Sequence, residues 1–168
     1  MKNKIYIVII LVACFVLIGD VFAGMPNNEV GQQVRSRVAN TVQEILQVAE
    51  RNEGIGSQIR VIAQNQNRNQ EKIESGIQKI KNRNPLTRFF VGPDYKEIGK
   101  VKETIEQNNQ QIEQLIQIKY QFIESGDKEQ LTEQIESLKQ ANLEVEDSLQ
   151  EMQKGFSLFG WLSKLISK

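Results

Sequence analysis

The sequence predicts an all-α protein whose long helices form an antiparallel coiled-coil hairpin or bundle. Apolar residues from position 94 to position 153 alternate in steps of three and four, which is the a/d repeat of a coiled coil. A second apolar stripe at helical spacing runs from position 30 to position 80. Turn residues interrupt these stripes at only a few points, so the 168 residues suit one domain built from a few long helices.

Residues 1–23 have the pattern of a secretory signal peptide. Two lysines precede an apolar run over residues 5–19, and Ala23 supplies a small residue where cleavage would occur. The run of about 15 residues is shorter than the roughly 20 that span a bilayer. We therefore expect cleavage after Ala23 and an exported chain, outside the cytoplasmic membrane. Two alternatives stay open: an uncleaved membrane anchor, and a lipoprotein that is acylated at Cys14.

Residues 24–29 are expected to form a linker, and residues 30–82 one continuous or kinked helix. Gly54 and Gly56 interrupt the helical pattern, but the apolar register continues through them, whereas a turn would usually reset it. In a continuous helix, replacing either glycine by alanine should be stabilising, most clearly at Gly56. The alternative is a true turn at this point, which would give a bundle of four similar helices.

Polar residues occupy several positions of the apolar stripes. Gln66 and Asn69 fall on core positions within a polar stretch, which we interpret as a weak, solvated part of the helix. The alternative is a buried polar layer that fixes register at a cost in stability. Asn108 also lies on the seam, and we expect either a buried register-setting amide or a solvated helix face.

Asn84 and Pro85 should stop the first long helix, because the residue before a proline avoids the α region. Phe89 and Phe90 follow, in the main aromatic cluster of the body. We expect them to plug the open end of the hairpin, with a surface knob for a partner as the alternative. Asp94 is then placed to cap the next helix, with Glu97 as the third helical residue.

Two further helices are expected over residues 94–124 and 128–154, which completes a helical coiled-coil domain over residues 30–154. Gly126 should close the first of them, and Asp127 should cap the second. The connection is so short that the two helices must run antiparallel. Their seam comprises Ile98, Val101, Ile105, Ile112, Leu115, Phe122, Leu131, Ile135, Leu138, Val145, Leu149 and Met152, with Asn108, Lys119 and Asn142 as polar members.

Residues 155–168 form a separate tail that predicts a short amphipathic helix. Its apolar face contains Leu158, Phe159, Trp161, Leu162, Leu165 and Ile166. Lysines flank this face, as in helices that lie in a membrane interface. We therefore assign these six residues as the candidate contact with a membrane or a partner. The alternative is that the tail packs back on the core of the protein.

The composition argues against an enzyme. The chain has no His, and its single Cys lies in the N-terminal apolar run, so the body lacks the usual nucleophile–base pairs and zinc ligands. Most carboxylates fall off the seam, on faces that water would cover. The 21 basic and 21 acidic residues balance, so nothing in the overall charge indicates nucleic acid. We expect no catalytic residue, no cofactor and no metal.

Three segments together carry a resemblance: residues 54–64, residues 90–96 and residues 156–161. With the N-terminal signal, they make the chain similar to a group of small, exported, coiled-coil hypothetical proteins from uncultured bacterial lineages. The resemblance covers nearly the whole chain after the signal. It implies export and a helical architecture, and it assigns no site residue.

The sequence thus favours a structural or interaction protein of the cell envelope. Its partners would be another protein, or a second copy of the chain through the coiled-coil faces, with a membrane surface as a further contact of the tail. The alternative is a holdase-like chaperone or adaptor whose helical arms grip extended clients.

Overall fold

The computed structural model describes residues 29–122 and 124–154, and every regular element within these ranges is a helix. The expected all-α class is therefore confirmed for this part of the chain. The signal segment, the linker up to residue 28 and the tail from residue 155 lie outside the described residues. The helices are α2 (Glu29–Arg51), α3 (Glu53–Lys81), α4 (Pro85–Val91), α5 (Tyr95–Lys119) and α6 (Ser125–Gln153).

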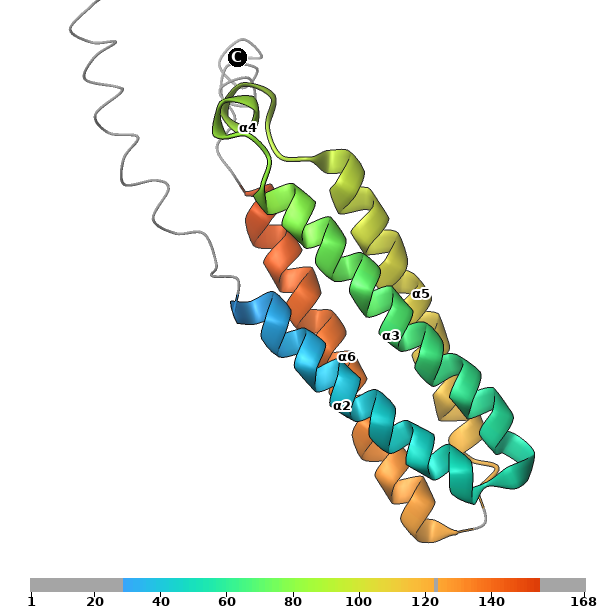
Figure 1. Cartoon of the computed structure of the whole chain (residues 1–168). Helices are drawn as coiled ribbons and strands as arrows, with labels where there is room; N and C mark the ends of the chain where they lie inside the picture. The colour runs from blue at the N-terminus through green and yellow to red at the C-terminus, as the bar shows by residue number, and fades with distance from the viewer. Residues whose placement is uncertain (1–28, 123, 155–168) are drawn as a thin grey trace, which may run out of the picture.

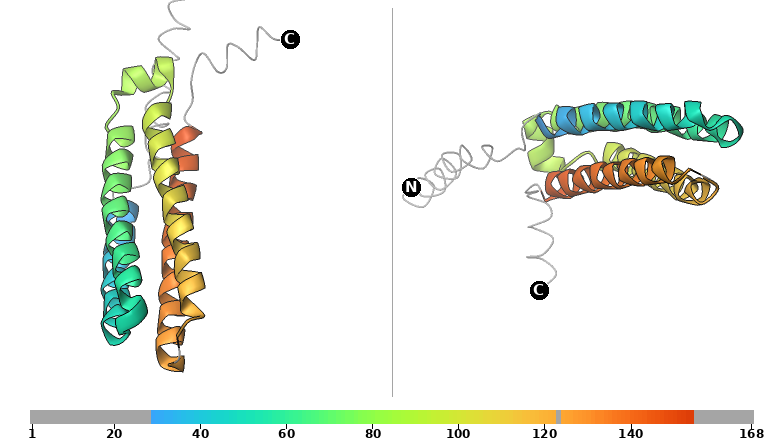
Figure 2. Two further views of the ribbon diagram at one scale, coloured as in Figure 1. Left: turned by 90° about the vertical axis from the view of Figure 1, so that its right-hand side faces the viewer. Right: turned by 90° about the horizontal axis from the view of Figure 1, so that it is seen from below.

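The four long helices lie side by side in an elongated bundle (Figures 1 and 2). Helix α2 packs on α3 and α6, and α5 packs on the same two helices, so each long helix has two principal neighbours. Successive long helices run in opposite directions (Figure 1). The short helix α4 crosses one end of the bundle, where it connects α3 to α5. We call this end of the bundle the α4 end.

A single apolar core runs along the bundle axis, and all twelve apolar residues expected on the seam of α5 and α6 are buried. Asn108 and Asn142 are buried as well. Lys119 departs from the prediction, because it is only half-buried and its neighbour Ile118 takes the core position. A straight α-helix has 3.6 residues per turn and drifts away from a strict seven-residue repeat, which explains the shift at the end of α5.

The expected continuous helix over residues 30–82 is wrong. Helix α2 ends at Arg51, the chain reverses at Asn52, and α3 returns along α2 (Figure 1). The Asn52 N–H donates to the carbonyl oxygen of Ala49 at 3.4 Å, and the Gly56 N–H donates to the carbonyl oxygen of Asn52 at 2.7 Å. The bundle with four long helices, which was the alternative, is the structure observed.

Gly56 makes this tight reversal possible. A Cβ atom at this position would overlap the backbone carbonyl of Ala49, in the last turn of α2. Only a residue without a side chain lets the start of α3 approach the end of α2 this closely. The expectation that alanine stabilises at Gly56 is therefore reversed by the structure. A Cβ atom at Gly54 would have no atom within 4 Å, so alanine fits there.

The apolar register survives the reversal because the turn consists of one residue. No extra residues are inserted to shift the phase, and the stripes of both helices face the same core. Val48 before the turn and Ile59 after it are both completely buried. An unbroken stripe is thus compatible with a turn when the two helices that it joins pack against each other.

The ends of the shorter segments follow local capping rules in part. The Asn84 side chain accepts a hydrogen bond from the Leu86 N–H at 2.9 Å and caps α4, with Pro85 as the first helical residue. The Asp94 side chain accepts from the Glu97 N–H at 3.2 Å, which confirms the predicted cap of α5. The side chains of Phe89 and Phe90, expected to plug the bundle, are not among those that the structure describes.

The predicted cap at Asp127 is wrong. Helix α6 already begins at Ser125, so Gly126 and Asp127 lie in its first turn. The Asp127 carboxylate instead accepts hydrogen bonds from Arg51 at 2.6 Å and 2.8 Å and from the Asn52 side-chain amide at 2.7 Å. A tertiary contact to the reversal between α2 and α3 has replaced the local cap.

Candidate functional site

The six tail residues assigned as the membrane or partner contact, Leu158 to Ile166, lie outside the described residues. Two other features of the described bundle stand out as candidate sites. One is the α4 end, and the other is a groove between α3 and α5.

The α4 end exposes large apolar side chains. Leu86 and Val91 of α4 are 65% and 64% exposed, and Tyr95 at the start of α5 is 63% exposed. Gly92 ends α4 with a φ of 95°, a left-handed conformation that favours glycine, and thereby turns the chain toward α5. These three residues were missed from the sequence. Leu86 and Val91 lie in a helix of seven residues, which is too short to show a clear periodicity, and Tyr95 lies at the first position of α5.

Two arginines link the α4 end to neighbouring parts of the chain. Arg88 Nη2 donates to the backbone oxygen of Met152 at 3.5 Å, which links α4 to the last turn of α6. Arg83 pairs with Asp94 at 3.8 Å across the two ends of the connection. Partial burial lowers the pKa of Lys81. Basic groups thus lie close to the exposed apolar residues.

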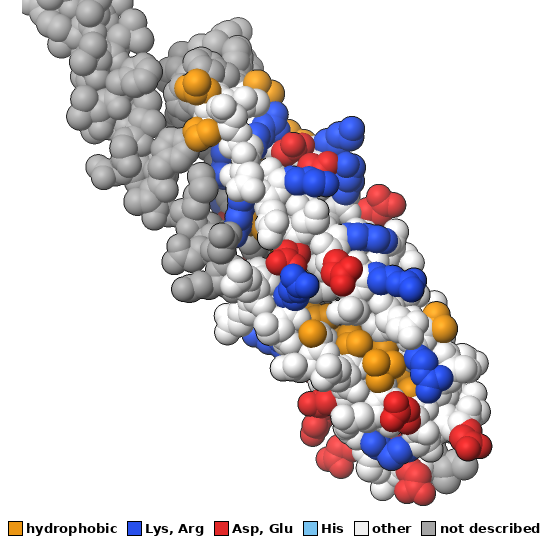
Figure 3. Space-filling model, in the orientation of Figure 1, with side chains coloured by type: hydrophobic (Ala, Val, Ile, Leu, Met, Phe, Trp, Pro, Cys, Tyr) orange, Lys and Arg blue, Asp and Glu red, His pale blue; other side chains and the backbone are white. Residues whose placement is uncertain are grey.

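Charge is unevenly distributed over the bundle, although the net charge of the chain is zero. On the face shown in Figure 3, Lys and Arg side chains predominate toward the α4 end, and Asp and Glu predominate at the opposite end. Apolar side chains are visible at the tip of the α4 end in the same view. On this face, an anionic surface would therefore be attracted toward the α4 end and repelled by the opposite end.

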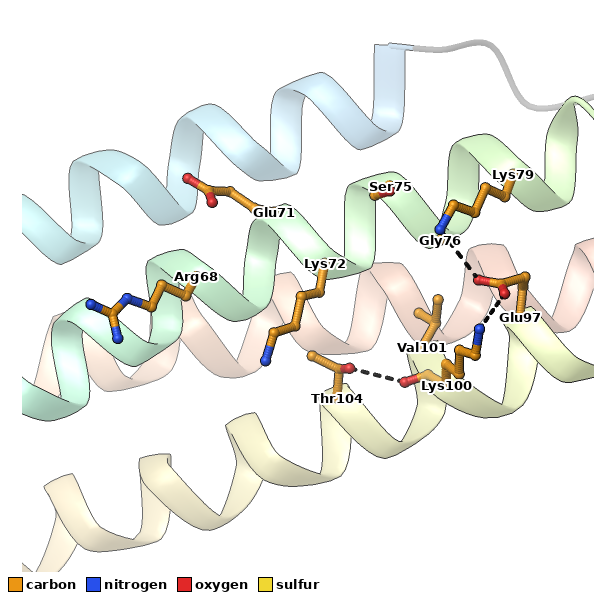
Figure 4. A pocket seen from close by; sticks show the side chains of 10 residues that line it. All are labelled: Arg68, Glu71, Lys72, Ser75, Gly76, Lys79, Glu97, Lys100, Val101 and Thr104. Atoms are coloured by element: carbon orange, nitrogen blue, oxygen red, sulfur yellow. Dashed lines mark hydrogen bonds and ion pairs between the residues drawn. The ribbon is translucent and has the colours of Figure 1, made fainter.

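The second candidate is a groove of about 580 Å³ between the C-terminal half of α3 and the N-terminal half of α5 (Figure 4). Its lining combines basic side chains with a small apolar floor. The lining residues are Arg68, Glu71, Lys72, Ser75, Gly76, Lys79, Glu97, Lys100, Val101 and Thr104.

Close approach of the helices forms the floor of this groove. A Cβ atom at Gly76 would overlap Cγ2 of Val101, so the glycine lets α3 and α5 touch at this level. Both residues are buried. On the wall, the Thr104 hydroxyl donates to the backbone oxygen of Lys100 at 2.9 Å, and its hydrogen is therefore committed within α5.

Glu97 sits between two lysines of the groove. Lys100 Nζ lies 2.5 Å from one carboxylate oxygen of Glu97, and Lys79 Nζ lies 4.0 Å from the other. The hydrogen bond from Lys100 holds the pKa of Glu97 below its ordinary value, so this carboxylate is charged at neutral pH. Glu97 thus partly neutralises one end of the basic groove.

A buried layer of amides lies deeper, between α3, α5 and α6. Asn69 Nδ2 donates to Asn108 Oδ1 at 2.8 Å, and Gln66 Nε2 donates to the backbone oxygen of Asn108 at 3.0 Å. Asn108 Nδ2 in turn donates to Asn142 Oδ1 at 3.3 Å. All four side chains are buried. The alternative of a buried polar layer is therefore correct for Gln66 and Asn69, and the solvated interpretation is wrong.

Some kinds of site have no counterpart in the part of the chain that the structure describes. Within it, no three His, Cys, Asp or Glu side chains gather as metal ligands would. None of the described helices is long and apolar enough to cross a membrane.

Comparisons of the chain with protein-family models, with curated proteins and with solved structures found no match.

Proposed function

We propose that this protein is an exported, non-enzymatic structural or interaction protein of the cell envelope. In this proposal α5 and α6 pair as an antiparallel coiled coil within a rigid, elongated bundle, and the α4 end and the tail contact a membrane surface. The observation that carries the proposal is the exposure of Leu86, Val91 and Tyr95 beside basic groups. Apolar side chains flanked by cations suit the interface of an anionic bilayer.

The place where the chain leaves the bundle supports this arrangement. Helix α6 ends at Gln153, and the Arg88–Met152 contact places this end beside α4. The described chain therefore ends at Lys154, on the same side of the bundle as the exposed apolar residues. Two weak contacts on the same side add their free energies of membrane binding, because the second is made at a high effective concentration.

The holdase-like alternative receives less support. A holdase of the expected kind would present an apolar seam between open arms. In the described bundle the seam residues of α5 and α6 pack into a core that they share with α2 and α3. We therefore favour a scaffold with docking at one end.

Binding of the full chain to vesicles tests the proposed membrane contact. The variant Leu86→Ser/Val91→Ser should sediment less with anionic vesicles than the wild type, because it removes exposed apolar area at the α4 end. The matched control is Val61→Ser/Leu143→Ser, since these side chains are 57% and 54% exposed on the flanks of α3 and α6. Equal vesicle binding by the wild type and both variants would refute docking through the α4 end.

Trp161 reports separately on the tail, because it is the only tryptophan. If the tail lies in the interface, its fluorescence should be solvent-like in the free protein and shift to the blue on addition of vesicles. The shift should be larger with anionic lipid because of Lys164 and Lys168. An emission that is already blue and does not respond to lipid would mean that the tail packs on the protein.

A further inference from the structure

We propose that the groove between α3 and α5 is a binding site for an elongated, phosphate-bearing anion of the polyphosphate type. This inference does not depend on the proposed membrane contact, since it rests on a different face of the molecule. The groove contains four cations, Arg68, Lys72, Lys79 and Lys100, but only two carboxylates, Glu71 and Glu97.

The carboxylates leave part of this positive charge unpaired. Glu97 is engaged by Lys100 and Lys79 at one end of the groove. Figure 4 shows that Glu71 points away from α5, whereas Arg68 and Lys72 extend toward it. Within the described residues, Arg68 has no partner, and Lys72 Nζ makes only a long contact of 3.4 Å with Asn69 Oδ1. An anion is the ligand class that this arrangement favours.

The spacing of the polar groups indicates an elongated ligand. Arg68, Lys72, Ser75 and Lys79 fall at helical steps of four, three and four, so they form one row along α3. The row is about 16 Å long at 1.5 Å per residue. A single phosphate cannot reach both ends of the row, whereas a chain of linked phosphates can contact several of its groups at once.

The chemistry of each group fits phosphate oxygens. The Arg68 guanidinium offers paired donors that match two phosphate oxygens, and Lys72 offers a mobile point charge. The Ser75 hydroxyl is exposed and has no partner in the described part of the chain, so it is available as a donor. A ligand phosphate would also compete with Glu97 for Lys79 and Lys100.

Titration calorimetry of the full chain with tripolyphosphate tests the site. Arg68→Gln/Lys72→Gln should weaken binding at least tenfold. The matched control is Arg60→Gln/Lys102→Gln, which removes the same charge from exposed positions of α3 and α5 outside the groove. It should change the dissociation constant less than twofold. Equal weakening by both double variants would overturn the proposal, because it would reveal only non-specific attraction, and so would undetectable binding by the wild type.

A variant that binds tripolyphosphate more tightly than the wild type shows that changes in affinity are not caused by misfolding. Glu97→Gln removes the carboxylate that competes for Lys79 and Lys100, so binding of tripolyphosphate should become several-fold tighter. Unchanged or weaker binding by Glu97→Gln would contradict the proposed role of these lysines.

Two sources could supply several phosphates along the row: a soluble polyphosphate, or neighbouring headgroups on the surface of an anionic bilayer. If Arg68→Gln/Lys72→Gln loses both tripolyphosphate and vesicle binding, the headgroup is the source. If it loses tripolyphosphate alone, the source is soluble. Loss of vesicle binding with unchanged tripolyphosphate binding would overturn the proposal.

Discussion

At the scale of single residues, one missing side chain decides the path of the chain. Gly56 is required because any Cβ would strike the Ala49 carbonyl, and the reversal at Asn52 depends on that close approach. A Cβ atom at Gly54, two residues earlier, would meet only open space. The two glycines look alike in the sequence and have opposite roles in the structure.

We therefore predict opposite effects of alanine at these two positions. Gly56→Ala should destabilise the protein by about 1–3 kcal/mol, as expected of overpacking against backbone that cannot move aside. Gly54→Ala should be neutral or stabilise by roughly 0.5–1 kcal/mol, because it lowers the entropy of the unfolded chain. Urea unfolding followed by circular dichroism measures both. Stabilisation by Gly56→Ala would instead support an unbroken helix.

Asn108 is the centre of the buried amide layer. Asn108→Ala would leave the Asn69 amide N–H and the Asn142 side-chain oxygen without this partner in the interior. Unsatisfied buried polar groups are costly, so the free energy of unfolding should fall by about 1–3 kcal/mol. Gln107→Ala, on the exposed side of the same turn, is the control and should be nearly silent. Equal losses in the two variants would mean that the amide layer is not buried as described.

The pKa of Asp127 predicts how the stability of the protein depends on pH. The hydrogen bond from Arg51 lowers the pKa of Asp127 from its ordinary value of 3.8. The folded protein therefore holds the charged carboxylate more strongly than the unfolded chain does. This contribution to stability is present above the unfolded pKa and is lost as the pH falls through the lower, folded pKa.

Asp127→Asn should accordingly show a weaker loss of stability than the wild type between about pH 5 and pH 3. Thermal unfolding at a series of pH values measures this difference. Asp147→Asn is the control, because Asp147 is exposed on α6 and makes no ion pair within the described residues. Parallel pH profiles for the wild type and Asp127→Asn would show that the contact to Arg51 does not act on stability.

At the scale of elements, the apolar periodicity predicted the features that depend on local sequence pattern, above all which residues are buried. The stripes of α5 and α6 identify nearly every core residue, since burial on one helix face repeats every three to four residues. The reversal at Asn52 could not be found this way, because a turn of one residue leaves the stripe unbroken. The role of Asp127 was hidden for another reason. Its partner Arg51 is 76 positions away, and local capping rules contain no such contact.

The candidate sites were equally hard to predict, for a physical reason. The groove exists because Gly76 meets Val101, which brings Lys72 and Lys100 from separate helices to one surface. Each cation alone looks like part of a solvated helix face. Only the packing of α3 against α5 makes them one cluster.

The seam of α5 offers a test at this scale. Ile112→Asp or Leu115→Asp should unfold the bundle, because these side chains are 1% and 0% exposed and the new charge would be buried without a partner. Gln114→Asp, on the exposed face between them, should leave stability nearly unchanged. Circular dichroism and the melting temperature distinguish the three variants. If all three melted alike, the register of α5 would be wrong.

At the scale of the whole molecule, the bundle has two different ends. The reversal at Asn52 and the connection between α5 and α6 lie at one end, joined by the contact of Arg51 with Asp127. The α4 end has the exposed apolar residues and the last turn of α6. The direction of every long helix is thus needed to place the α4 end. The return of α3 along α2 is the step that the sequence pattern did not reveal.

A distance between α2 and α3 tests that topology directly. Arg35 and Glu74 form an ion pair of 2.8 Å across these helices, although they are 39 positions apart. In one continuous helix the same residues would lie about 58 Å apart, at 1.5 Å per residue. Packed helices have axes only about 10 Å apart. Spin labels at Arg35→Cys and Glu74→Cys, in a chain with Cys14→Ser, should therefore show a distance well under half of the extended value in pulsed electron paramagnetic resonance.

A second labelled pair calibrates this measurement. Labels at Glu53→Cys and Glu74→Cys both lie within α3, so they should be about 32 Å apart whether or not the chain turns at Asn52. A short distance for the first pair together with the expected distance for the second establishes the return of α3 along α2. A long distance for both pairs would restore the single helix. In that case neither the groove nor the α4 end would exist as described, because both depend on how α3 packs.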